Sequence, residues 1–128
     1  MLSLLLLLLA AAPAGAQPVT QRLEFDHALP TLPGKSLRGM VIEFPPGASL
    51  PAHSHAPSAF LYHRVLEGAV RSSLNGYPVR VYRAGESFYE KPGDDHEIFA
   101  NASDTQPAKV LAVIVMDTAE QEPGVPAE

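Results

Sequence analysis

Apolar and polar residues follow each other in short runs along most of this chain. From Arg22 onward no segment keeps an apolar period of 3.6 residues for three turns, whereas runs of β-type residues recur between turn signals every eight to twelve residues or so. In residues 37–44, for example, Met40, Ile42 and Phe44 share one face of a strand by the two-residue period. The pattern predicts an all-β sandwich or barrel.

Turn signals divide this pattern into individual strands. Asn75 and Gly76 supply the two positive φ angles that a two-residue hairpin loop needs, so the runs on either side should pair. Residues 109–116 are apolar on both faces and should form a central strand. The expected strands are residues 37–44, 49–55, 59–66, 69–74, 77–82, 85–90, 96–100 and 109–116.

The first segment, residues 1–16, has the pattern of a secretory leader. A run of leucines is followed by Ala-Gly-Ala at residues 14–16, which predicts cleavage before Gln17. The alternative is a membrane anchor, but a spanning helix needs about 20 apolar residues, and Pro13 and Gly15 end this run earlier. We therefore expect a periplasmic or secreted protein without a membrane anchor.

The remaining chain is short enough for one domain, and we place that domain at residues 17–118. Residues 119–128 contain two prolines, a glycine and three glutamates, and are expected to form a disordered tail. The exposed edges of so small a barrel would need cover, which makes a homodimer a possible assembly.

Composition narrows the possible chemistry. The chain has 13 prolines and 9 glycines with only 18% charged residues, which favours short elements joined by tight turns. The absence of cysteine excludes disulfides, thiolate zinc sites and cysteine nucleophiles. The net charge is −5 and no basic stripe is present, so a nucleic acid is not an expected partner.

Histidine is then the obvious metal ligand, and three histidines stand at suggestive places. Gly47 is followed after five residues by His53-Ser54-His55, and residues i and i+2 of a strand project from the same face. A surface H-x-H pair without a ligand role is the alternative. His96, shortly after the expected turn at Pro92, offers the facing imidazole that a metal site would need.

These two blocks resemble the two motifs of the cupin superfamily, and the resemblance covers residues 37–116. Further support comes from Val-Leu-Glu-Gly at residues 65–68 and from Tyr-Arg-Ala-Gly-Glu-Ser-Phe at residues 82–88. The resemblance implies a single jelly-roll β-barrel with a divalent metal bound inside it. It assigns that metal to His53, His55 and His96.

One position departs from the family pattern. The first cupin motif usually carries a glutamate shortly after the histidine pair, but the corresponding positions here hold Ala59, Phe60 and Leu61. His63 and Glu90 are the candidate replacements. The alternative for His63 is a core histidine that is hydrogen-bonded to a neighbouring residue. The alternative for Glu90 is a solvated edge carboxylate, and we favour both alternatives.

Three neutral imidazoles would leave the ion's charge uncompensated and coordination positions open, which invites a small anionic ligand. Iron, zinc, copper, nickel and manganese all remain compatible. In this respect the chain resembles the three-histidine cupins, which include iron dioxygenases. The resemblance implies an oxygenase or isomerase-like enzyme acting on a small organic molecule. One alternative is a non-catalytic module that binds a metal or ligand, such as a sensor. Another is a metal-free cupin, and the three retained histidines disfavour this second alternative. The catalytic residues are unknown, and the acid–base candidates are Tyr62, Tyr89, His63 and Glu90.

Overall fold

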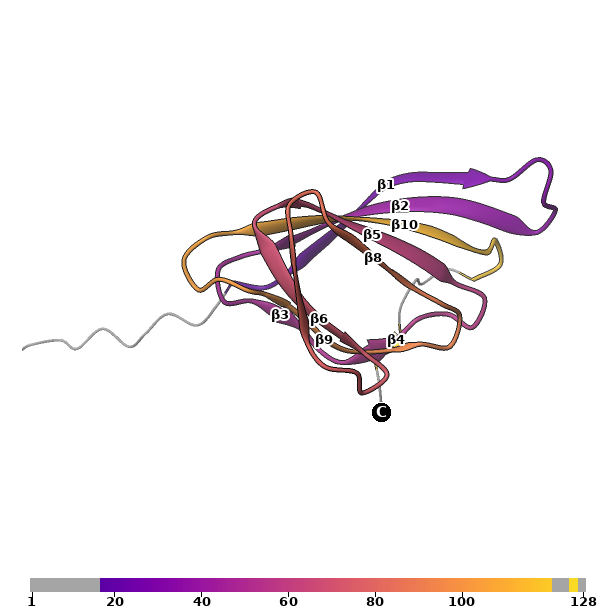
Figure 1. Cartoon of the computed structure of the whole chain (residues 1–128). Coiled ribbons are helices and arrows are strands. Elements are labelled where there is room, and N and C mark those ends of the chain that lie inside the picture. Colours follow the sequence, from indigo (N-terminus) through magenta and orange to yellow (C-terminus); the bar gives the residue numbers. More distant parts are fainter. Residues whose placement is uncertain (1–16, 121–124, 127–128) are drawn as a thin grey trace, which may run out of the picture.

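A computed structural model of the chain describes residues 17–120 and 125–126 (Figure 1). These residues form strands and turns, and no helix among them is long and apolar enough to cross a membrane. The leader at residues 1–16 lies outside the described residues, so its cleavage remains a prediction.

The strands form two antiparallel sheets that pack face to face. One sheet has the order β1-β2-β10-β5-β8, and the other has the order β11-β4-β9-β6-β7, with β3 paired to β9 (Figure 1). Side chains from both sheets share one core, in which Phe44 and Val110 of the first sheet contact Val70 and Phe99 of the second. The all-β jelly-roll prediction is thereby confirmed. The strands are β1 Thr20–Ala28, β2 Lys35–Phe44, β3 Ser49–Leu50, β4 His53–Ser54, β5 Phe60–Glu67, β6 Ala69–Leu74, β7 Arg80–Arg83, β8 Ser87–Glu90, β9 Asp95–Asn101, β10 Ala108–Asp117 and β11 Val125–Pro126.

β10 is the central strand that its sequence predicts. It pairs with β2 along its full length on one side and with β5 on the other. Every second side chain of β10 is buried, from Ala108 to Met116, while the intervening ones are half-buried. The strand therefore anchors the sheet on which His63 and Glu90 lie.

Two differences from the expected strands occur near the N-terminal half. Residues 49–55 form two short strands, β3 and β4, because Pro51 between them has no N–H to donate to a ladder. The strand β1, which pairs with β2, was not expected from the sequence. It is exposed along nearly its whole length, so it lacks the alternation of buried and exposed side chains that marks a strand with one buried face.

The hairpin prediction is confirmed at its turn. Asn75 has φ 52° and Gly76 has φ 73°, and the Tyr77 N–H donates to the Leu74 carbonyl at 2.9 Å. The returning strand β7 begins only at Arg80, later than the expected residues 77–82, since Pro78 cannot donate to the ladder. Likewise β8 begins at position 87 and not at 85, because the preceding two residues belong to a turn.

The C-terminal residues differ in part from the expected disorder. Val125–Pro126 forms β11, which pairs with Ser54 and His53 of β4. Residues 121–124 and 127–128 of the expected tail lie outside the described residues, whereas Glu120 is described and its N–H donates to the Asp117 carbonyl at 3.0 Å.

Candidate metal centre

The second sheet brings the three predicted histidines together. His53 of β4 lies directly opposite His96 of β9 in the antiparallel register, and His55 follows two residues later. Their ring centroids are 5.1 Å apart for His53 and His96, and 4.8 Å apart for His53 and His55. One ligand atom of each histidine lies within 4.8 Å of the other two. The cluster thus has the dimensions of one ion-binding site.

The broken strand before His53 fixes the orientation of its ring. The backbone carbonyl of Pro51 accepts a hydrogen bond of 2.9 Å from Nδ1 of His53. This bond places the proton on Nδ1 and leaves the Nε2 lone pair for a metal. Burial lowers the pKa of His53 below its ordinary value, which favours the neutral imidazole that a metal requires.

A second cluster, formed by His63, Glu90 and His96, shares one histidine with the first and is fully buried. Glu90 is 0% exposed, so the expectation of a solvated edge carboxylate is wrong. The expectation that His63 is a buried, hydrogen-bonded histidine is confirmed, but its partner is Glu90, at 2.6 Å from Nε2. Both side chains therefore belong to the site.

The register of the first sheet explains how a glutamate reaches this place. Glu90 of β8 lies directly opposite Leu61 of β5. Leu61 is one of the positions where the family pattern places its glutamate. Because paired residues of neighbouring strands project to the same face, a carboxylate at position 90 enters the barrel beside that position. The neighbouring strand thus brings a carboxylate beside the position that Leu61 occupies.

Three histidines surround the Glu90 carboxylate. Its Oε2 lies 2.6 Å from Nε2 of His63 and 3.2 Å from Nε2 of His55, and its Oε1 lies 3.4 Å from Nδ1 of His96. Burial opposes the ionisation of Glu90, but the contacts with the three histidines outweigh it and hold the pKa of this carboxyl far below its ordinary value. Burial also lowers the pKa of His63, so its neutral ring donates to an ionised carboxylate.

This arrangement fits a divalent cation. Among the described residues, Glu90 Oε1, His63 Nδ1 and His96 Nδ1 are buried without a hydrogen-bond partner. When two donor atoms each lie about 2.1 Å from one ion, and the donor–ion–donor angle lies between a right angle and the tetrahedral angle, the two donors are about 3.0–3.4 Å apart. The separations of Glu90 from His55 and His96, 3.2 and 3.4 Å, fall in this range.

Neighbouring side chains hold the histidine rings in place. His63 stacks on Phe88 with centroids 4.6 Å apart, and His96 stacks on Phe99 at 4.5 Å. The hydroxyl of Ser72 and Nε2 of His96 form a hydrogen bond of 2.8 Å. These contacts preorganise the imidazoles. Phe88 and Ser72 come from strands other than those of the histidines they contact, so sequence spacing gives no indication of these two contacts.

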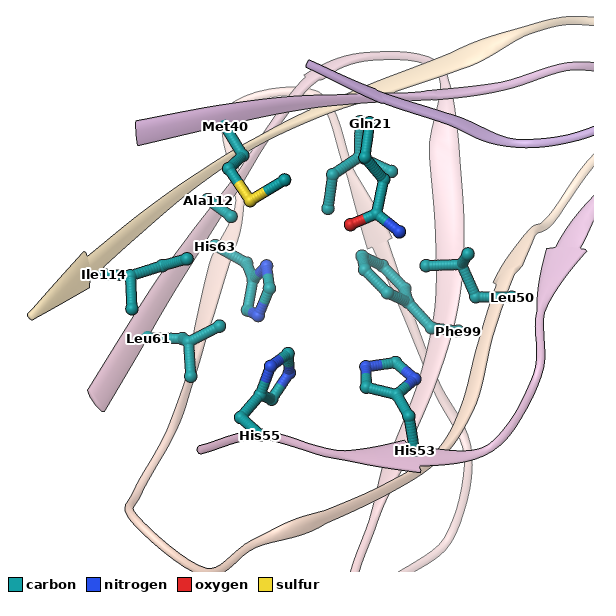
Figure 2. Close-up of a pocket in the computed structure, with 11 residues that line it drawn as sticks. Gln21, Met40, Leu50, His53, His55, Leu61, His63, Phe99, Ala112 and Ile114 are labelled. Carbon is teal, nitrogen blue, oxygen red and sulfur yellow. The ribbon is translucent and has the colours of Figure 1, made fainter. Parts of the chain in front are cut away.

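A small, mostly apolar cavity adjoins the histidines (Figure 2). Its volume is about 20 Å³, enough for a single water or ion but far below that of a typical ligand pocket. The lining residues are Gln21, Met40, Ile42, Leu50, His53, His55, Leu61, His63, Phe99, Ala112 and Ile114.

The two tyrosines considered as acid–base groups are not part of the site. Tyr62 and Tyr89 alternate along β5 and β8 with the inward-facing His63 and Glu90, and they remain exposed on the outer face of the sheet. Of the remaining acid–base candidates, His63 lines the cavity, and Glu90 lies behind it at hydrogen-bond distance.

Comparison with known proteins agrees with this architecture. The cupin domain family matches residues 40–114. An uncharacterized conserved protein with a double-stranded β-helix domain from Klebsiella pneumoniae has a TM-score of 0.66 at 17% identity, over 86% of this chain and 88% of that one. A cupin protein from Desulfovibrio desulfuricans has a TM-score of 0.60 at 24% identity, over 89% and 95% of the two chains.

Several of the similar structures carry the name of an enzyme. One is an oxalate oxidase with 25% identity and a TM-score of 0.54, and the match covers 64% of this chain but only 46% of the oxidase. No curated protein matches the sequence.

Proposed function

Because the chain belongs to the cupin family, we propose that it binds a divalent transition metal through His53, His55 and His96, with Glu90 as the carboxylate, and acts on a small organic anion. The proposed activity is that of an oxygenase or isomerase-like enzyme. Such a metal, when bound, supplies Lewis-acid or redox chemistry.

The observation that carries this proposal is the burial of the Glu90 carboxyl group among three imidazoles. A carboxylate without exposure to water is costly unless a positive partner neutralises it. The three histidines around it can supply hydrogen bonds, but neutral imidazoles supply no net charge. A divalent cation satisfies the carboxylate and the ring nitrogens together.

The donor set leaves the metal's identity open among iron, zinc, copper, nickel and manganese. Imidazole suits the first four, and the added carboxylate also suits manganese. With one carboxylate, a divalent ion keeps one positive charge uncompensated. That charge favours an anionic ligand such as a carboxylate or an enolate.

The protein residues would orient such a ligand. His63 donates a hydrogen bond from Nε2 to Oε2 of Glu90, and this bond would hold the carboxylate in its orientation toward the metal. The apolar walls of the cavity exclude water from the reacting atoms.

A second candidate function is a module that holds its metal and ligand without turnover. The cavity volume of about 20 Å³ favours it, because a closed site of this size admits an organic substrate only after side chains move.

Metal analysis combined with oxygen consumption separates these functions. The protein should be purified without added metal, analysed by mass spectrometry for the five metals, and then supplied with oxalate and other small carboxylates in an oxygen electrode. Bound iron, manganese or copper with carboxylate-dependent oxygen uptake supports an oxygenase. Stable zinc without turnover supports the binding module, and no bound metal contradicts both.

A further inference from the structure

One polar side chain faces the cavity from the side opposite the histidines. Gln21 of β1 lies opposite Ile42 in the strand register and lines the cavity. Figure 2 shows its amide directed into the interior, while His53 and His55 lie at the other end. None of the side-chain hydrogen bonds within the described part of the chain involves this amide.

The wall between these two ends is apolar. It includes Met40, Leu50 and Phe99 (Figure 2), and Ile42 also lines the cavity. Ligand pockets typically combine such apolar walls with a few polar groups that fix the ligand's orientation. Gln21 is the lining residue, other than the histidines, whose side chain can donate or accept a hydrogen bond.

We infer that Gln21 forms a second subsite that selects the ligand of the proposed metal centre. The inference rests on the proposed function. The ligand is a small organic acid whose carboxylate lies at the histidine end, whose carbon chain contacts the apolar wall, and whose far end carries a carbonyl or hydroxyl group. The Gln21 amide N–H donates to that far oxygen.

Side-chain movement provides the space for such a ligand. Gln21 lies on a strand that is exposed along nearly its whole length, so its side chain can shift to follow the far oxygen of a ligand without breaking a packed core. Met40 is half-buried, and the unbranched methionine side chain readily adopts other rotamers.

A matched pair of acids tests this subsite. 4-Oxopentanoate and pentanoate differ only in the far carbonyl, and their binding to Co²⁺-loaded protein can be followed in the visible absorption of the cobalt. The wild type should bind 4-oxopentanoate roughly 3- to 10-fold more tightly, as expected for one added hydrogen bond. In Gln21→Leu this ratio should fall to about one with pentanoate affinity retained, whereas the exposed control Gln106→Leu should keep the wild-type ratio.

Two results would overturn the subsite while the metal centre stands. In the first, the cobalt-loaded wild type binds both acids equally or binds neither. In the second, the Gln21→Leu protein keeps the wild-type affinity ratio. Cobalt stoichiometry is measured first, because a protein that takes up no cobalt contradicts the proposed function itself and the subsite with it.

Discussion

At the scale of single residues, the site depends on which side chains reach the barrel interior. The histidine pair and His96 could be predicted because their spacing along the chain is local and characteristic. The role of Glu90 could not, because it depends on the pairing of β8 with β5, which places Glu90 opposite Leu61. A carboxylate on a neighbouring strand leaves no fixed spacing in the sequence.

Glu90→Gln tests whether this carboxylate contributes to metal binding. The substitution keeps the size of the side chain and removes its charge, so metal affinity should fall by at least about 10- to 100-fold. Competition with a chelator of known affinity measures the change. The control is Glu97→Gln, at an exposed position on the same strand as His96, and it should bind the metal as tightly as the wild type does. Equal metal affinity in the two variants would show that Glu90 does not contribute to metal binding.

His63 gives a second prediction at this scale. If His63 acts by donating its 2.6 Å hydrogen bond to Glu90, then His63→Ala should weaken metal binding by roughly 10- to 100-fold. His63→Gln should retain more of the affinity, because its amide can still donate to the carboxylate. The same chelator competition compares the two, and unchanged affinity in His63→Ala would show that this hydrogen bond is not needed.

At the scale of the elements, short strands and their turns place the ligands. The two-residue apolar period identified most strands, but it failed where no face is buried, as in β1, and where a proline interrupts the ladder, as between β3 and β4. The latter failure matters for function. The interruption at Pro51 provides the carbonyl that fixes the His53 ring.

The hairpin turn is coupled to the strand that carries His96. Leu74 pairs with His96, and the Asp95 N–H donates to the side chain of Asn75 at 2.9 Å. The turn conformation therefore supports the position of one proposed ligand.

Gly76→Val should accordingly destabilise the fold by about 1–2 kcal/mol, because valine disfavours a positive φ. A Cβ at this position meets only the Glu97 side chain, at 4.0 Å, so the cost is conformational and not steric. Denaturant unfolding measures the effect. Gly76→Asn should cost less, since asparagine adopts this conformation more readily, and equal stability of wild type and Gly76→Val would contradict the turn.

At the scale of the whole molecule, the jelly roll brings distant segments to one cavity. Its motifs made the fold predictable, whereas the cavity's small volume could not be predicted, because it depends on how Met40, Leu61 and Phe99 fill the space between the sheets. The proposed export of the molecule follows from the leader at residues 1–16 alone.

The leader predicts that exported protein begins at Gln17, because small residues at positions 14 and 16 satisfy the cleavage rule. Intact-mass measurement of periplasmic or secreted material checks this. A mass that includes the leucine run would instead indicate an N-terminal anchor.

The central claim is that His53, His55 and His96 hold one metal, and metal content per chain in alanine variants tests it most directly. The wild type should contain about one ion, and each of the three single substitutions should lose most of it during dialysis against a chelator, because each removes one of the four proposed ligands of a single coordination sphere. His27→Ala removes an exposed histidine outside the cavity and should keep the wild-type content. Full metal occupancy in His96→Ala would contradict the account.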